Sequence, residues 1–184
     1  MEFGKIILLN GVSSSGKTTL AKELQKVLQE PYFHLSYDTF FFMMPQKYFG
    51  YDNEVCESMI NLLHNCIVTF TKLKANVIID HVFYKKSMLL DCINLLKDYP
   101  VLFVGVHCPL NELERREKER GNRRVGQAKE QLEFFHKNEI YDIEVDTFNN
   151  TISECAQLIT DKLVTYEFSK AFTEMYDRYK NEII

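Results

Sequence analysis

The sequence lacks the features of membrane-spanning, exported and disulfide-bonded proteins. It contains no run of about 18 apolar residues that could cross a bilayer. Its amino end has no basic leader followed by a long apolar core. The five cysteines are scattered and form no CxxC pair, which favours buried thiols in a reducing cytosol over a metal site or disulfide frame. We therefore expect a cytoplasmic protein that does not associate with membranes.

Strong positive charge and internal divisions are also missing. The formal net charge is −4 over 184 residues, which argues against a nucleic-acid partner. No repeat, low-complexity segment or linker divides the chain, and its length suits one domain with a proper core. The sequence thus predicts a single domain over residues 1–184.

What is present is an alternation of short apolar runs with amphipathic segments. Strands are predicted at 5–10, 33–37, 76–80, 101–108 and 141–147. Helices are predicted at 17–29, 53–73, 86–97, 110–120 and 127–138, and from Thr151, in a capping box with Glu154, to about 165. This order predicts a three-layer α/β/α fold with a five-stranded, mostly parallel sheet.

A glycine-rich loop, GVSSSGKT, follows the first predicted strand and fits G-x-x-x-x-G-K-[ST] in full. Glycine allows the unusual φ angles and close approach with which successive backbone N–H groups surround phosphates, and the next helix adds its partial positive charge. The expected nucleotide-binding residues are Gly11, Val12, Ser13, Ser14, Ser15, Gly16, Lys17, Thr18 and Thr19. Lys17 is expected to reach the β and γ phosphates of ATP, and Thr18 to hold Mg²⁺.

Two acidic residues follow predicted strands and suit a kinase for small molecules. A GTPase is disfavoured because the strand ending at Asp80 continues without the glycine of D-x-x-G, and no N-K-x-D occurs. Asp38 is expected to orient or deprotonate an acceptor hydroxyl, and Asp80 to serve Mg²⁺. The alternatives are a helix-cap or turn aspartate for Asp38 and an aspartate satisfied by backbone groups for Asp80.

Two further segments could complete such a site. Residues 40–51, FFFMMPQKYFGY, fit neither a regular helix nor a regular strand and suggest an apolar wall for an aromatic or lipophilic acceptor, or a plain core segment. Residues 115–127 suggest a small lid that is rich in arginine. Arg120 and Arg123 are expected to stabilise the moving phosphoryl group and Arg124 to contact the nucleotide. The alternative, favoured for Arg115, is a solvated helix face with ion pairs.

The tail, residues 166–184, carries apolar side chains at steps of three and four. They are Phe168, Phe172, Met175, Tyr179 and Ile183. Packing on the same domain is favoured for this helical extension, and the alternative is a homo-oligomer that uses it as an interface.

Four stretches together resemble the chloramphenicol phosphotransferase-like proteins, a family of small P-loop kinases. They are IILLNGVSSSGKTTLAKELQ, Asp38-Thr39-Phe40 with Met44-Pro45, VLFVGVHCPLNELERREKERGNR and YDIEVDT, spanning residues 5 to about 150. The resemblance implies ATP and Mg²⁺, a hydroxylated small-molecule acceptor, and an activating carboxylate at Asp38. The bulky run Phe40–Met44 and Asn122, where the family suggests aspartate, depart from the pattern and leave the acceptor open.

The leading hypothesis is an ATP-dependent phosphotransferase acting on a small-molecule alcohol, with an antibiotic such as chloramphenicol as one candidate. A kinase for a nucleoside, nucleotide or nucleotide-sugar is the alternative within enzymes, and a more polar acceptor pocket would favour it. An ATP-binding sensor or scaffold without turnover, whose tail recruits a partner, is the alternative from another class.

Overall fold

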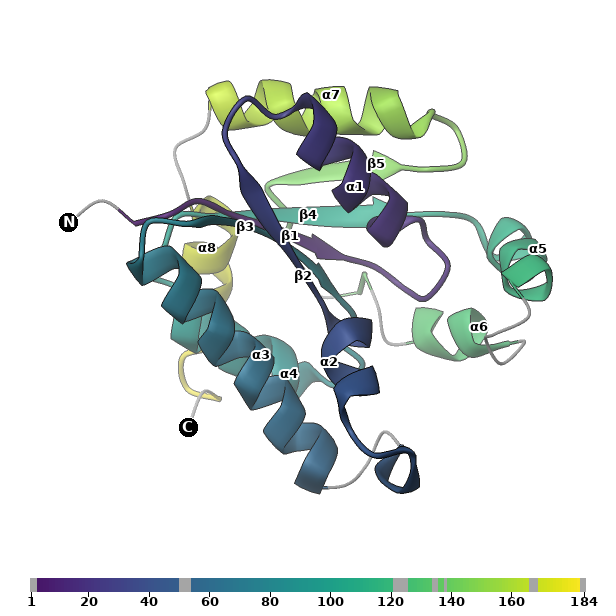
Figure 1. The fold of residues 1–184 in the computed structure, drawn as a ribbon, viewed down its shortest axis with the longest axis horizontal. Helices are drawn as coiled ribbons and strands as arrows, with labels where there is room; N and C mark the ends of the chain where they lie inside the picture. The colour runs from purple at the N-terminus through teal and green to yellow at the C-terminus, as the bar shows by residue number, and fades with distance from the viewer. Residues whose placement is uncertain are drawn as a thin grey trace.

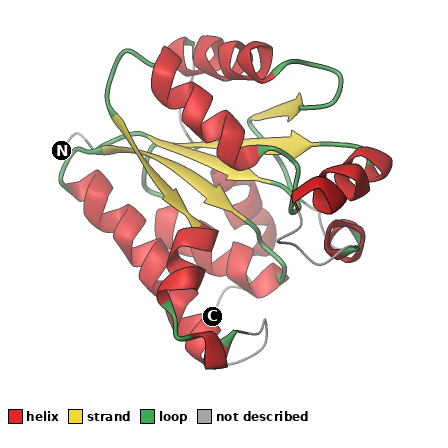
Figure 2. Ribbon diagram, turned by 45° about the vertical axis from the view of Figure 1, so that its right-hand side comes forward, coloured by secondary structure: helices red, strands yellow, loops and turns green. Residues whose placement is uncertain are grey.

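The computed structural model describes residues 3–49, 54–120, 126–133, 136–137, 139–165 and 169–182. Its strands are β1 (Ile6–Asn10), β2 (Tyr32–Ser36), β3 (Asn76–His81), β4 (Val101–His107) and β5 (Ile143–Asp146). They form one sheet in the order β2-β3-β1-β4-β5, and every pairing is parallel (Figure 2). The prediction of five strands is confirmed, and the described sheet is parallel throughout.

Helices cover both faces of this sheet. They are α1 (Lys17–Val27), α2 (Tyr37–Met43), the 3₁₀ turn η1 (Gln46–Tyr48), α3 (Glu54–Lys72), α4 (Lys86–Leu96), α5 (Leu110–Arg120), α6 (Gln127–Leu132), α7 (Ile152–Val164) and α8 (Lys170–Tyr179). Figure 1 shows α1 and α7 on one face and α3, α4 and α8 on the other, with α5 and α6 beyond the end of the sheet. The predicted three-layer arrangement is confirmed.

The central strand β1 supplies both halves of the core. Ile6 and Leu8 point into the cluster shared with α3, α4 and α8, whereas Ile7 and Leu9 point into the cluster shared with α1 and α7. All four side chains are fully buried. Successive side chains of a strand point to opposite faces, so a continuous apolar run is what a strand buried on both sides requires.

The segment after β2 differs from the prediction. The strand ends at Ser36, and the chain turns at once into helix α2, although residues 40–51 were expected to be irregular. The Ser36 hydroxyl caps this helix by accepting a hydrogen bond from the Thr39 backbone N–H at 3.1 Å. Pro45 follows the end of α2, consistent with proline's inability to continue a helix. The aromatic run is therefore partly helical.

Two predictions about later helices have different outcomes. The helix predicted over 127–138 ends at Leu132 in the structure, and residues 134, 135 and 138 lie outside the described ones. The capping box at the start of α7 is confirmed, with Thr151 and Glu154 bonded in both directions.

The apolar stripe of the tail packs on its own domain. Phe172 and Met175 of α8 are fully buried, and the helix contacts α4 and β4. Phe168 and Ile183 lie outside the described residues. The preferred prediction for this segment is confirmed, whereas the homo-oligomer stays a prediction. Among the described residues, no helix has the length and apolar character needed to cross a membrane.

Candidate active site

The glycine-rich loop runs from the end of β1 to the start of α1 in a conformation that requires its glycines. Gly16 has φ 96°, in the left-handed region that glycine tolerates best. A Cβ atom on Gly11 would lie 2.5 Å from the carbonyl oxygen of Val106. Replacing either glycine would therefore strain the turn or push it away from β4.

The loop presents polar groups that suit an anion. The hydroxyls of Ser13, Ser14 and Ser15 are buried, and within the described residues they make no hydrogen bond. Helix α1 begins directly after them at Lys17, and Gly16 at its N-cap has no side chain to cap the first N–H groups. Buried polar atoms require partners, and the oxygens of a phosphate group would supply them here.

Lys17, Thr18 and Asp80 meet at the mouth of the loop. The Thr18 hydroxyl donates to Asp80 Oδ2 at 2.5 Å, and Lys17 Nζ lies 3.8 Å from Asp80 Oδ1. Lys17 Nζ also donates to the carbonyl oxygens of Gly11 and Val12 at 2.9 Å. The Asp80 carboxylate is thus bonded to a side chain of the loop, which differs from the backbone-satisfied alternative.

Strand register brings Asp38 to the same edge. Asp80 lies beside Leu9 of β1 and beside Ser36 of β2, and Asp38 follows Ser36 in the first turn of α2. Because the carboxyl ends of parallel strands share one edge, residues distant in sequence converge there. A single cavity is lined by the loop, Asp38, Phe41, Asp80, Tyr84, Arg120, Gln127 and Gln131, among others.

An aromatic wall flanks Asp38. The rings of Tyr37 and Phe41 are stacked with centroids 5.9 Å apart, and Phe49 packs on Phe41 at 4.6 Å. Phe42 and Met43 are 63% and 74% exposed beside this cluster. Tyr37 and Phe41 of this segment line the cavity that contains Asp38, and the acceptor wall stays a prediction.

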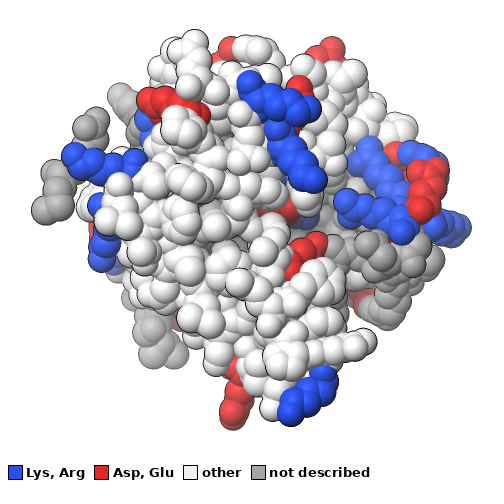
Figure 3. Space-filling view, in the orientation of Figure 1, with Lys and Arg blue, Asp and Glu red and all other residues white. Residues whose placement is uncertain are grey.

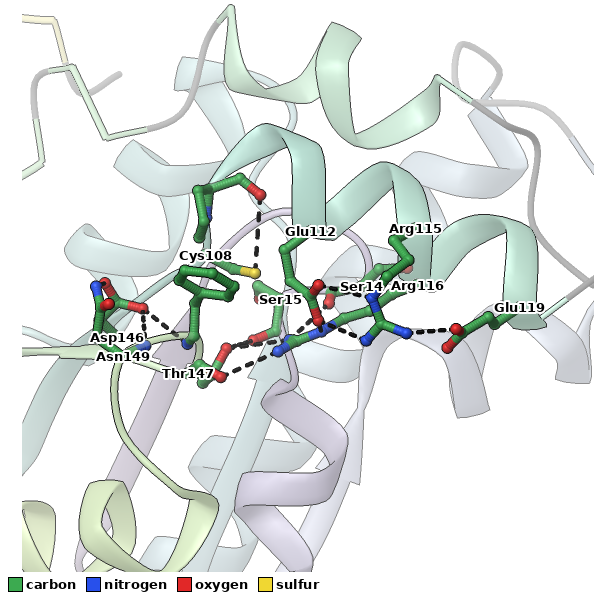
Figure 4. A network of polar contacts seen from close by, with 12 residues as sticks. Ser14, Ser15, Cys108, Glu112, Arg115, Arg116, Glu119, Asp146, Thr147 and Asn149 are labelled. Carbon is green, nitrogen blue, oxygen red and sulfur yellow. Dashed lines mark hydrogen bonds and ion pairs between the residues drawn. The ribbon is translucent and has the colours of Figure 1, made fainter.

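Arg116 of α5 clamps the loop from the opposite side (Figure 4). Its guanidinium donates to the Ser14 carbonyl at 3.3 Å and to the Thr147 hydroxyl and carbonyl at 3.1 and 3.0 Å. Thr147 in turn donates to the Ser15 carbonyl at 2.7 Å. Glu112 holds the guanidinium in place at 2.7 Å. This planar, multiply bonded arrangement is specific to arginine.

The remaining arginines of the predicted lid divide into two groups. Arg115 is exposed and pairs with Glu112 and Glu119, as expected for a solvated helix face, and charged side chains gather over α5 in Figure 3. Arg120 lines the cavity that also contains Asp38. Arg123 and Arg124 lie outside the described residues, so their roles stay predictions.

Sequence reasoning gave no role to Arg116, Thr147 or Gln131. Thr147 is the last residue of YDIEVDT, and Arg116 belongs to the basic segment, so both lie in stretches that the sequence analysis discussed. The contact between them could not be predicted from their positions in the sequence. Gln131 accepts a hydrogen bond from the Ser13 backbone N–H at 2.6 Å. No pattern singled it out because glutamine is common on solvated helices.

Comparison with known proteins matches most of the chain to one family. Residues 4–164 match the family described as "Chloramphenicol phosphotransferase-like protein". A Mycobacterium tuberculosis protein named "Putative O-phosphotransferase" is 28% identical over 204 residues, covering 97% of this chain and 91% of the relative.

Solved structures with the same fold include two bacterial proteins. The Mycobacterium tuberculosis APS kinase CysC, in complex with AMPPNP and APS, has a TM-score of 0.70 at 18% identity and covers 89% of this chain and 99% of its own. The Deinococcus radiodurans tunicamycin resistance protein has a TM-score of 0.67 at 20% identity. The match covers 87% of this chain and 95% of that protein. The chain belongs to the chloramphenicol phosphotransferase-like family and is an ATP-dependent phosphotransferase.

Proposed function

We propose that this phosphotransferase moves the γ-phosphoryl group of ATP to a hydroxyl group of a small-molecule acceptor, with Mg²⁺ as cofactor. The observation that carries the proposal is that the phosphate loop and Asp38 line one cavity. A phosphoryl donor held by the loop and an alcohol beside the carboxylate would face each other across it. Positioning of this kind, with electrostatic stabilisation, is the main source of catalysis in phosphoryl transfer.

The donor end would be held by Lys17, Thr18 and Asp80. The ammonium of Lys17 is aimed at the loop interior by its bonds to two loop carbonyls, where it would meet phosphate oxygens. The Thr18 hydroxyl and the Asp80 carboxylate are hard oxygen donors of the kind that Mg²⁺ prefers. The described residues contain no cluster of three or more His, Cys, Asp or Glu side chains that could enclose a metal. Two protein oxygens leave positions for phosphates and water, and bound Mg²⁺ would neutralise charge on the transferring group.

The nucleoside end has a groove of its own. Gly16, Thr19, Arg116, Thr147 and Ile152 line a depression on the outer side of the loop. The polar backbone of the loop and the guanidinium of Arg116 would offer hydrogen bonds and a planar surface to a base or ribose. The related APS kinase was solved with AMPPNP, which supports a nucleotide in a site of this fold.

The acceptor end combines one carboxylate with an apolar wall. Asp38 would orient the hydroxyl or take its proton, and Arg120 would stabilise negative charge on the moving phosphoryl group. Phe41 and its aromatic neighbours favour an acceptor with an apolar or aromatic part. The likeness to a tunicamycin resistance protein makes hydroxylated antibiotics, chloramphenicol included, one class for the acceptor screen.

Intact-mass measurement of a panel of alcohols incubated with protein, ATP and Mg²⁺ tests the proposal. We expect one class to gain a phosphate and Asp38→Asn to slow that transfer about 100-fold or more. The nucleotide affinity, measured by calorimetry, should change less than about twofold, since a general base contributes to the reaction rather than to donor binding. Asp161→Asn on the exposed side of α7 is the matched control. Full transfer by Asp38→Asn would refute the role of Asp38, and transfer only to nucleosides would point to the nucleoside-kinase alternative.

A further inference from the structure

A side chain of α6 occupies part of the phosphate loop. The Ser13 backbone N–H donates to Gln131 Oε1 at 2.6 Å, which is short for an N–H···O hydrogen bond. Ser13 is buried and belongs to the run of loop residues whose N–H groups are suited to phosphate oxygens. The side-chain carbonyl oxygen of Gln131 therefore lies where an oxygen acceptor of a phosphate group would bind.

The two acceptors compete because the Ser13 N–H has a single hydrogen. A phosphate oxygen carries formal charge, and hydrogen bonds with an ionised partner are about twice as strong as neutral ones. Filling of the loop by phosphates would therefore displace the neutral Gln131 carbonyl rather than share the N–H with it. The free energy of breaking the internal bond would be subtracted from the free energy of nucleotide binding.

Displacement of Gln131 would act on more than one side chain. Helix α6 is joined to α5 by Glu117, whose buried carboxylate accepts hydrogen bonds from the backbone N–H groups of Gly126 at 2.8 Å and Ala128 at 2.7 Å. Helix α5 also carries Arg116, which holds the Ser14 carbonyl. Thus α5 and α6 contact the loop at adjacent residues, and a change at Ser13 is coupled to both helices.

We propose that Gln131 is an internal ligand of the phosphate loop that competes with the nucleotide phosphates and links their binding to the position of α6. This inference rests on the proposed function in one respect, namely that the loop binds the phosphates of a nucleotide. It adds a residue that sets the affinity for the phosphoryl donor.

Calorimetric titration with ADP tests the proposal on three variants of the full chain. Gln131→Met keeps the length of the side chain and removes the strong acceptor, so ADP should bind about threefold to tenfold more tightly, as expected for loss of one competing neutral hydrogen bond. Gln131→Glu places a carboxylate at the same N–H and next to the phosphates, so ADP should bind at least about tenfold more weakly. Lys129→Ala, on the exposed face of α6, should bind ADP like the wild type.

Opposite shifts in the two Gln131 variants distinguish competition from packing. If both variants bind ADP more weakly, Gln131 supports the site or binds the phosphate itself, and the proposal is overturned. Equal affinity in all four proteins overturns it as well. Failure of the wild type to bind ADP would instead contradict the proposed function. Circular dichroism of each variant confirms that the affinities compare folded proteins.

Discussion

A pair of buried histidines supports the strand end that carries Asp80. His64 of α3 and His81 of β3 face each other with their Nε2 atoms 3.1 Å apart, and both side chains are at most 2% exposed. One ring must donate and the other accept, so this hydrogen bond forms when both rings are neutral. Burial lowers the pKa of His64 to about 4. Burial, then the neighbouring His64, lowers the pKa of His81 well below its ordinary value.

Because both histidine pKa values are lowered in the folded chain, the stability of the fold depends on pH. The unfolded chain binds a proton at His64 near pH 6.5, whereas the folded chain resists protonation until about pH 4. The neutral pair therefore contributes fully to the free energy of unfolding above pH 6.5. This contribution is lost as the pH falls towards 4. For His64 alone the loss is about 2 kcal/mol at pH 5 and about 3 kcal/mol when complete. The lowered pKa of His81 acts in the same direction.

Urea unfolding at pH 7 and pH 5 measures this effect. The chain contains no tryptophan, so far-ultraviolet circular dichroism is the appropriate signal. Between the two pH values, the wild type should lose about 2 kcal/mol more unfolding free energy than His64→Gln, in which an amide can still bond to His81 but does not titrate. The remaining titrating groups are common to both proteins. Replacing His64 also removes its effect on the pKa of His81, so the difference reports the titration of the histidine pair. Equal pH dependence in the two proteins would refute the reasoning.

Three further changes probe the loop and its clamp. Gly16→Ala should destabilise the fold by about 1–2 kcal/mol in urea unfolding, because φ at this position is 96°; unchanged stability would contradict the left-handed turn. Arg116→Lys should weaken ATP binding about tenfold in calorimetry by losing the multiple bonds to Ser14 and Thr147, whereas the control Arg115→Lys, an exposed residue, should remain within about twofold. Thr18→Val should weaken the Mg²⁺-dependent part of ATP affinity about tenfold, and equal Mg²⁺ dependence in the variant and the wild type would exclude Thr18 as a ligand.

The parts of the fold that were predicted correctly are those with local signals. The strand at β1 was evident because a strand buried on both faces needs an unbroken apolar run, and Gly11 and Gly16 mark a turn that other residues tolerate poorly. The capping box at Thr151 was equally local. In contrast, the start of α2 at Tyr37 was missed because Ser36 can end a strand or cap a helix, and the β-forming aromatic residues that follow gave no helical period.

The contacts that were missed join segments far apart in the sequence. Thr18 and Asp80 were both expected at the Mg²⁺ ion, but the direct hydrogen bond between them depends on β3 lying next to β1, a consequence of the strand order. Arg116 and Arg120 lie four residues apart on one helix, and only the position of α5 decides which reaches the Ser14 carbonyl and which lines the cavity. The composition of this segment predicted a basic lid, but only the tertiary structure shows that Arg116 and Arg120 make different contacts.

The position of α8 bears on the alternative of a scaffold that recruits partners through its tail. Such a role needs an apolar face that is available to another chain, but Phe172 and Met175 are fully buried within the domain. The Ala171 backbone N–H is also held by Asp142, which lies just before β5, at 2.9 Å. Releasing this helix would expose core side chains at a cost of about 1.5–3 kcal/mol for each large one. The described part of the tail therefore contributes to the stability of the domain, and its buried apolar residues Phe172 and Met175 are not available to a partner.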